Sequence, residues 1–301
     1  MSLKALLIPQ LNQPGKREHV PTFAAGDAIP RVIHQIGMRP AFQDRQLPPR
    51  LQENVDHLRA LNPGWDYRFH DDAAIEAFIR QHYGPAVWRL YGRIDTRYGA
   101  ARADLFRYLL MYKVGGVYLD IKSSAALPFD AVIRPDDRFI LSQWHTEDGQ
   151  YAYWGEQHDV RNVKGGEYQQ WHIMCAPGHP LMKAVVEGVL SNIEAYDPYL
   201  HETGKPGVLR LTGPSAYTLA IERSRARHPH RLVPGHDRLG LEYNIYSAAP
   251  QSHVQVFGSH YSQQTAPIVR LGLLKRPLSQ GYRLAQYLQQ KLHRRAAKAA
   301  R

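Results

Sequence analysis

Residues Tyr98–Lys122 read YGAARADLFRYLLMYKVGGVYLDIK, and this stretch decides the fold class. Ala100–Lys113 is rich in strong helix formers, which predicts a helix. The pair Gly115-Gly116 ends that helix, because glycine adopts positive φ without strain. The apolar residues Val117–Leu119 then predict a short strand. The stretch is therefore expected to fold as a helix, a tight turn and a strand in close succession.

Three charged residues of this unit are placed for chemistry. Asp120 follows the predicted strand, and open α/β sheets bind ligands outside the carboxyl ends of their strands. Asp104 and Arg107 are three residues apart on the predicted helix, so both side chains can point the same way. These residues are the first candidates for a functional site.

The preceding sequence alternates between strand-like and helix-like segments. Arg31–Ile36 is short, β-branched and closed by Gly37, which predicts a buried strand. A run with apolar residues on one helical face follows Pro49, Trp65–Phe69 predicts a second strand, and Ala73–Gln81 predicts a further helix. Strands that alternate with helices predict an α/β fold with a mixed, mostly parallel sheet flanked by helices.

The rest of the chain completes one large domain between two extensions. Pro180–Ala195 and Ala216–Arg225 predict helices, and Val254–Phe257 predicts a strand. The first 25 residues carry no sustained periodicity. We therefore expect a loose N-terminal arm at residues 1–25, a globular domain at residues 26–265 and a basic amphipathic tail at residues 266–301.

The composition is that of an ordinary globular protein, with 44% hydrophobic and 22% charged residues. A single cysteine, Cys175, excludes an intramolecular disulfide and is expected to be an inert thiol in the core. No stretch approaches the roughly 20 apolar residues that span a bilayer. The apolar run Ala5–Ile8 is too short for the core of a signal peptide. We therefore expect a cytoplasmic location.

Most of the net charge of +11 lies at the C-terminal end. Ile268–Arg301 holds nine basic residues and no acidic one, and its apolar residues recur at helical spacing. A cationic amphipathic helix is typical of binding to an anionic membrane surface, which would keep the protein on the inner face of the cell membrane. Nucleic-acid contact and a plain solvated tail are the alternatives. The nearly neutral body and the lack of a recognition motif argue against nucleic acid.

The unit at Tyr98–Lys122 resembles the sugar-binding region of glycosyltransferase family 32, whose pattern is roughly A-x-x-A-D-x-x-R-Y-x-x-L-x-x-x-G-G-x-Y-x-D-x-D. The residues that match in register are Asp104, Arg107, Tyr108, Gly115, Gly116, Tyr118 and Asp120. The resemblance extends more weakly over residues 29–265, through Ile29–Ile36, Asn62–Trp65 and Thr212–Pro214. Such an ordered series is more specific than a lone D-x-D.

The resemblance implies a GT-A type fold and a retaining, hexosyltransferase-like enzyme that takes a sugar from a UDP- or GDP-linked donor. The acceptor would be a surface glycan such as capsule or lipopolysaccharide, or a lipid-linked glycan. A front-face mechanism, in which the leaving diphosphate helps to deprotonate the acceptor, needs no nucleophile or general base from the protein. The alternative is a non-catalytic relative that still binds a sugar nucleotide or a glycan.

The resemblance also assigns site residues. Asp104 and Arg107 would hold the hydroxyls and phosphate of the sugar donor, and Asp120 would contact the ribose, the sugar or a metal ion. The first strand would border the nucleotide base. The catalytic candidates are Asp104, Arg107, Asp120 and Lys122, and the substrate-binding candidates are His34, Gln35, Ile36, Asp72, Gly116, Tyr118, Gly213 and His260.

Two residues depart from the family pattern. Lys122 replaces the second acid of D-x-D, and Gly37 stands where relatives usually carry a tryptophan. Either Asp120 and His260 suffice to bind Mn²⁺ or Mg²⁺, or the Lys122 ammonium replaces part of the metal's charge against the diphosphate. We expect weak or absent metal dependence.

Structural roles compete for several of these residues. Asp104 and Arg107 could form an exposed helix pair, and Asp71 or Asp72 could cap the helix that follows them. The aromatic residues between Trp144 and Trp171 could stack on an acceptor sugar or belong to the core. The ordered match as a whole favours the functional interpretation of the helix and strand.

Overall fold

The computed structural model describes residues 11–13, 17–38, 47–144, 151–246, 264–272 and 280. The α-helices in these ranges are α2 (Pro49–Leu61), α3 (Asp72–Arg93), α4 (Gly99–Val114), α5 (Phe129–Val132), α6 (Pro180–Ala195), α7 (Pro198–His201), α8 (Gly204–Leu211) and α9 (Pro214–Glu222). The strands are β1 (Val32–Ile36), β2 (Asp66–His70), β3 (Gly116–Leu119), β4 (Ser124–Ala125), β5 (Phe139–Ser142), β6 (His172–Cys175), β7 (Arg231–Val233) and β8 (Leu241–Glu242).

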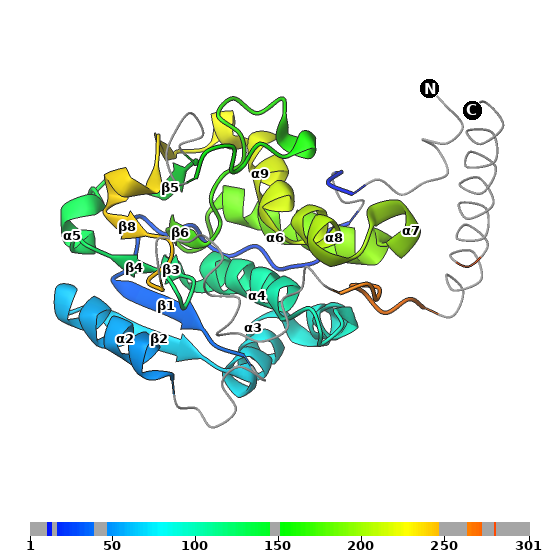
Figure 1. The fold of residues 1–301 in the computed structure, drawn as a ribbon, viewed down its shortest axis with the longest axis horizontal. Helices are drawn as coiled ribbons and strands as arrows, with labels where there is room; N and C mark the ends of the chain where they lie inside the picture. The colour runs from blue at the N-terminus through cyan, green and yellow to red at the C-terminus, as the bar shows by residue number, and fades with distance from the viewer. Residues whose placement is uncertain are drawn as a thin grey trace, which may run out of the picture.

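Six strands form one mixed sheet in the order β2-β1-β3-β6-β5-β7 (Figure 1). β1 runs parallel to β2 and β3, and β5 runs parallel to β7. β6 pairs antiparallel with both β3 and β5, so it alone among the six points the other way. The predicted α/β fold, with a mixed and mostly parallel sheet flanked by helices, is confirmed.

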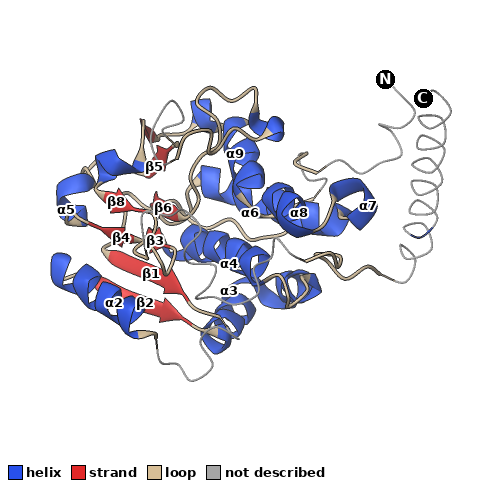
Figure 2. Cartoon of the chain, in the orientation of Figure 1, coloured by secondary structure: helices blue, strands red, loops and turns tan. Residues whose placement is uncertain are grey.

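Two clusters of buried side chains cover the two faces of this sheet. One cluster packs the sheet against α3, α4, α6, α8 and α9, and the other packs it against α2 and α5, which lie on the opposite side of the sheet in Figure 2. Successive residues of β3 alternate between them: Tyr118 belongs to the first, and Val117 and Leu119 belong to the second. Cys175 is fully buried in the first cluster, as predicted.

Helix α4 is enclosed by the rest of the fold. It contacts β3 as well as α3, α6 and α8, and every residue from Asp104 to Tyr112 is buried. A helix that is buried on every side belongs to the core. The fold therefore carries Asp104 and Arg107, at 3% and 5% exposure, into the interior, and an exposed helix pair is excluded.

Gly115 and Gly116 join α4 to β3 where a side chain would not fit. Their φ angles are 70° and 102°. A Cβ on Gly115 would lie 2.6 Å from the backbone nitrogen of Pro177, and a Cβ on Gly116 would lie 2.6 Å from the carbonyl oxygen of Val32. The predicted end of the helix is confirmed, and the same two residues allow β3 to pack closely against its surroundings.

Helix α3 is longer than predicted. The sequence pattern placed its end at Gln81, but the helix runs for 22 residues through a kink at Gly84. Pro85, which lacks a backbone N–H, follows the kink in the position of a first-turn proline. Asp71 caps the helix start by accepting a hydrogen bond from the backbone N–H of Ala74 at 2.8 Å, which confirms the capping prediction for this residue.

The described part of the N-terminal segment is not the loose arm that was predicted. Val20 is buried, and the Glu187 carboxylate accepts hydrogen bonds from the backbone N–H groups of His19 and Val20 at 2.8–3.0 Å. The two ring nitrogens of His19 lie 2.8 Å from Glu187 and 3.0 Å from Glu194, both on α6. Carboxylates of a distant helix hold this segment, so no local periodicity could reveal it.

His19 is expected to stabilise the fold more in mild acid than in base. Glu187, aided by Glu194, raises the pKa of His19 above its ordinary value against the opposing effect of burial. This stabilisation is complete below the pKa of the unfolded state, about 6.5. It is lost as the pH rises through the raised pKa of the folded state. We expect His19→Gln to lower the free energy of unfolding by about 1.5–3 kcal/mol at pH 6.

Urea denaturation of both proteins at pH 6 and pH 9 measures this effect. The difference between wild type and His19→Gln should shrink at the higher pH, because the wild-type imidazole has then lost its charge. A difference of equal size at both pH values would show that packing, and not the two ion pairs, explains the loss.

The globular domain extends beyond its predicted end at residue 265. Ile268 and Val269 are fully buried. The backbone N–H of Asp95 donates to the carbonyl oxygen of Ile268 at 2.8 Å, and Val269 forms a β-bridge with Ile94. Within the described ranges no helix is long and apolar enough to cross a membrane. The strand predicted at residues 254–257 and the membrane-binding helix predicted in the tail lie outside the described residues.

Candidate functional site

The carboxyl ends of β1, β2 and β3 lie at one edge of the sheet, because the three strands run parallel. Asp120 follows β3 directly, and Lys122 comes two residues later. Gln35 of β1 donates a hydrogen bond from its side-chain amide to the backbone oxygen of Asp120 at 3.2 Å, and it accepts one from the Tyr67 hydroxyl of β2 at 2.7 Å. Side chains from β1 and β2 therefore hold the backbone that presents Asp120.

Four charged side chains meet at this edge, and we call them the charged cluster: Asp104, Arg107, Asp120 and Lys122. Arg107 Nη2 lies 3.2 Å from Asp104 Oδ1, and Arg107 Nη1 lies 2.9 Å from Asp120 Oδ1. Lys122 Nζ lies 3.4 Å from Asp120 Oδ2. Opposite charges therefore alternate through the cluster. All four residues were catalytic candidates from the sequence, and the fold brings them together.

Neutral groups fix the helical half of the charged cluster. The Thr212 hydroxyl donates to Asp104 Oδ2 at 2.9 Å, and the Gln170 side-chain amide donates to Asp104 Oδ1 at 3.2 Å. The backbone oxygen of Gln170 accepts from Arg107 Nη1 at 3.0 Å. Asp104 and Arg107 therefore have hydrogen-bond partners beyond each other, which limits their movement.

Asp120 is the member of the charged cluster that solvent reaches most. Its side chain is 23% exposed, whereas the side chains of Arg107 and Lys122 are 6% and 8% exposed. The guanidinium carbon of Arg107 lies 4.7 Å from the centre of the Tyr118 ring, and Lys122 Nζ lies 3.6 Å from the centre of the Tyr243 ring. Each cation therefore forms a cation–π contact with one aromatic ring, which stabilises its positive charge.

The environment keeps Asp120 ionised. Burial acts to raise the pKa of Asp120, but Arg107, Lys122 and the Tyr118 hydroxyl outweigh it and hold the pKa below its ordinary value. Burial lowers the pKa of Lys122, and the Asp120 carboxylate opposes that change. Burial also raises the pKa of Asp104, against the effect of Arg107. The outer half of the cluster is therefore an ion pair with Asp120 as the anion.

The donor set of the charged cluster does not fit a divalent cation held by protein carboxylates. Mg²⁺ and similar ions prefer several oxygen ligands, but here Lys122 replaces the second acid of D-x-D and its ammonium lies against Asp120. Among the described residues, no group of three or more His, Cys, Asp or Glu side chains could hold a metal ion. His260, the other predicted metal ligand, lies outside the described residues.

Residues 48–139 match the family model described as "Glycosyltransferase sugar-binding region containing DXD motif". This range contains all four residues of the charged cluster. This part of the chain is therefore similar to a glycosyltransferase sugar-binding region. The family resemblance seen in the sequence is confirmed by this match.

Several curated relatives of this sugar-binding region are yeast mannosyltransferases. The chain is 29% identical over 110 residues to inositol phosphoceramide mannosyltransferase 1 of Schizosaccharomyces pombe. That alignment covers 36% of this chain and 32% of the yeast protein. It is 31% identical over 186 residues to inositol phosphoceramide mannosyltransferase 3 of the same yeast, an alignment that covers 62% of this chain and 44% of that protein. It is 25% identical over 202 residues to the initiation-specific alpha-1,6-mannosyltransferase of that yeast, with 64% of this chain and 48% of that protein covered. The chain thus spans less than half the length of each of these three relatives.

Solved structures with a distant likeness to this chain include glycosyltransferase domains of toxins. The UDP-bound domain from the YGT toxin has a TM-score of 0.47 at 9% identity, with 78% of this chain and 83% of that chain covered. The PaToxG glycosyltransferase has a TM-score of 0.43 at 14% identity, with 66% and 70% covered.

Two of the three residues predicted to border the nucleotide base lie in the core instead. His34 is fully buried, with Nδ1 3.1 Å from His70 Nε2 and with Nε2 3.1 Å from the carbonyl oxygen of Gly115. Burial lowers the pKa of His34 to about 3, so the ring is neutral. Ile36 packs in the core on the same side. Of the three, Gln35, whose side chain leaves the opposite face of β1, contacts the charged cluster through the backbone oxygen of Asp120, so the prediction for His34 and Ile36 is corrected.

The other predicted substrate contacts divide between the site and the scaffold. Tyr118 belongs to the site, because its hydroxyl donates to Asp120 Oδ1 at 2.9 Å. Gly116 serves strand packing, as described above. Gly213 precedes α9, and a Cβ there would lie 2.9 Å from Leu209 Cα, so this glycine serves close packing. Asp72 is the first residue of α3 and lies in its first turn.

Three side chains that complete the site were not candidates from the sequence: Thr212, Gln170 and Tyr243. The Thr212–Pro214 motif marked the correct loop, but the hydroxyl before the predicted Gly213 makes the contact. Gln170 precedes an aromatic residue, and Tyr243 follows β8. No local pattern marks either of them, because the tertiary fold brings them to the charged cluster.

The tryptophans of the aromatic stretch belong mainly to the core. Trp144 and Trp171 are buried, and their rings lie 5.3 and 5.4 Å from the ring of Tyr243. The Trp144 indole donates to the Glu167 carboxylate at 3.0 Å, and burial raises the pKa of that carboxyl to about 7. Because Tyr243 also covers Lys122, this aromatic group forms a wall behind the charged cluster.

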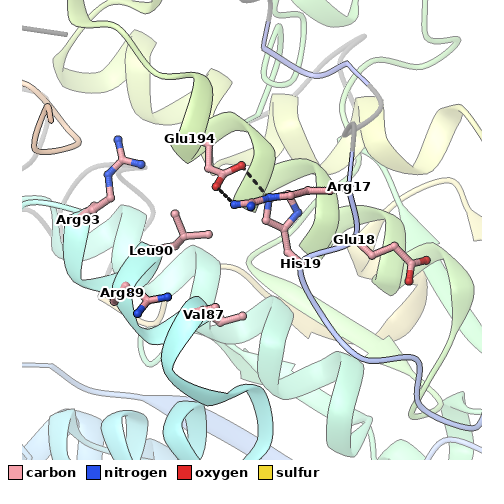
Figure 3. A pocket seen from close by; sticks show the side chains of 9 residues that line it. Arg17, Glu18, His19, Val87, Arg89, Leu90, Arg93 and Glu194 are labelled. Carbon is pink, nitrogen blue, oxygen red and sulfur yellow. Dashed lines mark hydrogen bonds and ion pairs between the residues drawn. The ribbon is translucent and has the colours of Figure 1, made fainter. Parts of the chain in front are cut away.

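A cavity of about 380 Å³ lies where the N-terminal segment meets α3 and α6 (Figure 3). Arg89, Leu90 and Arg93 of α3 line one side, and Arg17 and Glu194, which form an ion pair, line the other. No member of the charged cluster lines this cavity. It is therefore separate from the charged cluster.

Proposed function

We propose that this protein transfers mannose or another hexose from a UDP- or GDP-linked donor to a glycan or glycolipid acceptor. The observation that carries the proposal is the charged cluster, which lies at the carboxyl edge of a mostly parallel sheet and inside the matched sugar-binding region. The names of the yeast relatives support the transfer of mannose, and two of them name a lipid acceptor, inositol phosphoceramide. For this chain we propose a surface glycan such as capsule or lipopolysaccharide.

Each half of the charged cluster has a role in this proposal. We assign Asp104 and Arg107, which Thr212 and Gln170 hold in position, to bind the hydroxyls of the donor sugar. Lys122, together with Arg107, supplies positive charge where the diphosphate gains negative charge as it leaves.

The proposed reaction retains the configuration of the sugar. The bond between the anomeric carbon and the diphosphate oxygen breaks, and the acceptor oxygen bonds to the same face of that carbon. The leaving diphosphate keeps the electron pair and takes the proton of the acceptor hydroxyl. No side chain of the charged cluster is assigned as nucleophile or general base.

A panel of UDP- and GDP-sugars tests the proposal. We expect the purified protein to release nucleoside diphosphate slowly from one donor, because transferases of this kind hydrolyse their donor without an acceptor. Added acceptor glycan or lipid should increase that release, and the linkage in the product should keep the configuration of the donor. A product of inverted configuration would overturn the retaining mechanism.

The second candidate is a non-catalytic protein that binds a sugar nucleotide. One observation favours it: the ion pairs of Arg107 and Lys122 with the two carboxylates cancel the formal charges of the charged cluster without a ligand. Thermal stabilisation by one nucleotide, without turnover of any donor in the presence of acceptors, would support this alternative. Neither turnover nor stabilisation by any nucleotide would refute both candidates.

A further inference from the structure

Lys122 is the one residue of the charged cluster that departs from the D-x-D pattern of the matched family. The substitution is not a solvated lysine at the end of a strand. The Lys122 side chain is 8% exposed, Nζ lies 3.4 Å from Asp120 Oδ2, and the ring of Tyr243 covers the ammonium at 3.6 Å. An ammonium has three hydrogen-bond donors, so within the described part of the chain these two contacts leave one donor for a ligand.

Formal charge explains how a lysine can replace an acid at this position. In a D-x-D site the second carboxylate contributes one negative charge, and its divalent cation contributes two positive charges. The pair therefore adds one positive charge, which a lysine ammonium adds by itself. With Lys122 the formal charges of Asp104, Arg107, Asp120 and Lys122 cancel without any ion.

The position of Lys122 also opposes a divalent ion. A bound Mg²⁺ or Ca²⁺ lies about 2.0–2.6 Å from its carboxylate oxygens. An ion at that distance from Asp120 Oδ2 would be close to an ammonium that already lies 3.4 Å from the same oxygen. Because the ammonium is almost fully buried, water would screen the repulsion poorly.

We propose that Lys122 takes the place of both the second acid and its divalent cation, so that this site binds the diphosphate of a sugar nucleotide without a metal ion. The inference rests on the proposed function for its substrate, but its claim about metal binding stands apart from turnover. Lys122 contacts a diphosphate oxygen through its remaining donor, Asp120 holds the ammonium in place, and Tyr243 closes the site behind it.

Restoring the family motif is the sharpest test. Lys122→Asp should create a metal-dependent site, with nucleotide release at least tenfold slower in EDTA than in Mn²⁺. Wild type should change less than twofold between the two conditions. Lys122→Met, which matches the length of lysine but has no charge and no oxygen ligand, should be slow in both.

Mn²⁺ binding, followed by the electron paramagnetic resonance signal of the free ion, gives a readout that needs no turnover. Wild type should leave the signal unchanged, whereas Lys122→Asp should bind one Mn²⁺ ion. The double variant Lys122→Asp with Asp120→Asn should no longer bind that ion.

Wild-type turnover that stops in EDTA and returns with Mn²⁺ would overturn the inference. Wild-type Mn²⁺ binding that disappears in Asp120→Asn would also overturn it. If no protein turns over any sugar nucleotide, the proposed function fails while the binding experiment still decides the metal question. If Lys122→Asp does not fold, the two wild-type measurements decide it.

Discussion

Asp120→Asn is expected to slow nucleotide release by about 10²–10³-fold, the effect of removing one preorganised electrostatic group from an active site. Asp120 forms ion pairs with Arg107 and Lys122 and accepts a hydrogen bond from the Tyr118 hydroxyl. The substitution keeps the size of the side chain but removes the anion between two almost buried cations: Lys122 loses its carboxylate partner, and Arg107 keeps only Asp104. Removing one partner of a buried ion pair costs roughly 3–5 kcal/mol. We expect the lower end of that range, because the Asp120 side chain is 23% exposed.

A second carboxylate of the matched region provides the control. Asp66 forms an ion pair with Arg68 at 2.7 Å, but the two side chains are 54% and 47% exposed. Asp66→Asn should change the free energy of unfolding by no more than about 0.5–1 kcal/mol and leave nucleotide release unchanged. Release should be measured where circular dichroism shows each variant folded. If folded Asp120→Asn keeps more than a tenth of wild-type release, Asp120 has no part in the chemistry.

The central helix–strand unit could be predicted from the sequence because its signals are local. Two glycines with positive φ end α4, a short apolar strand follows, and Asp120 comes directly after it. Residues three apart on one helix share a face whatever surrounds them, so the pairing of Asp104 with Arg107 was also predictable.

Other features could not be predicted because contacts distant in sequence produce them. His34 looks like a ligand in the sequence, but the alternation of β1 turns it toward His70 and Gly115, while Gln35 faces the charged cluster. The N-terminal segment carries no periodicity, yet carboxylates on α6 hold it. A sequence pattern assigns a residue to a strand or loop, but the packing of neighbouring elements decides which side chain of that segment reaches the site.

Arg107→Lys tests whether the shape of the guanidinium matters as much as its charge. Arg107 donates to Asp104, to Asp120 and to the backbone oxygen of Gln170, at 2.9–3.2 Å, while its plane lies near the Tyr118 ring. A lysine keeps the positive charge, but its compact ammonium lacks the planar fork that lets the guanidinium reach acceptors on different sides at once. We expect nucleotide release to fall by about 10–10²-fold. The free energy of unfolding should fall by roughly 2–4 kcal/mol, because buried acceptors lose their partners.

The same substitution on the surface separates this effect from a general cost of replacing arginine. Arg80 on α3 pairs with Glu76 one helical turn away, and the two side chains are 55% and 48% exposed. Arg80→Lys should therefore stay within about 0.5 kcal/mol of wild type and keep full nucleotide release. If Arg107→Lys behaves in the same way, the charged cluster needs only a positive charge at this position. If it loses release while a nucleotide still stabilises it thermally, Arg107 positions the sugar for reaction and contributes little to holding the nucleotide.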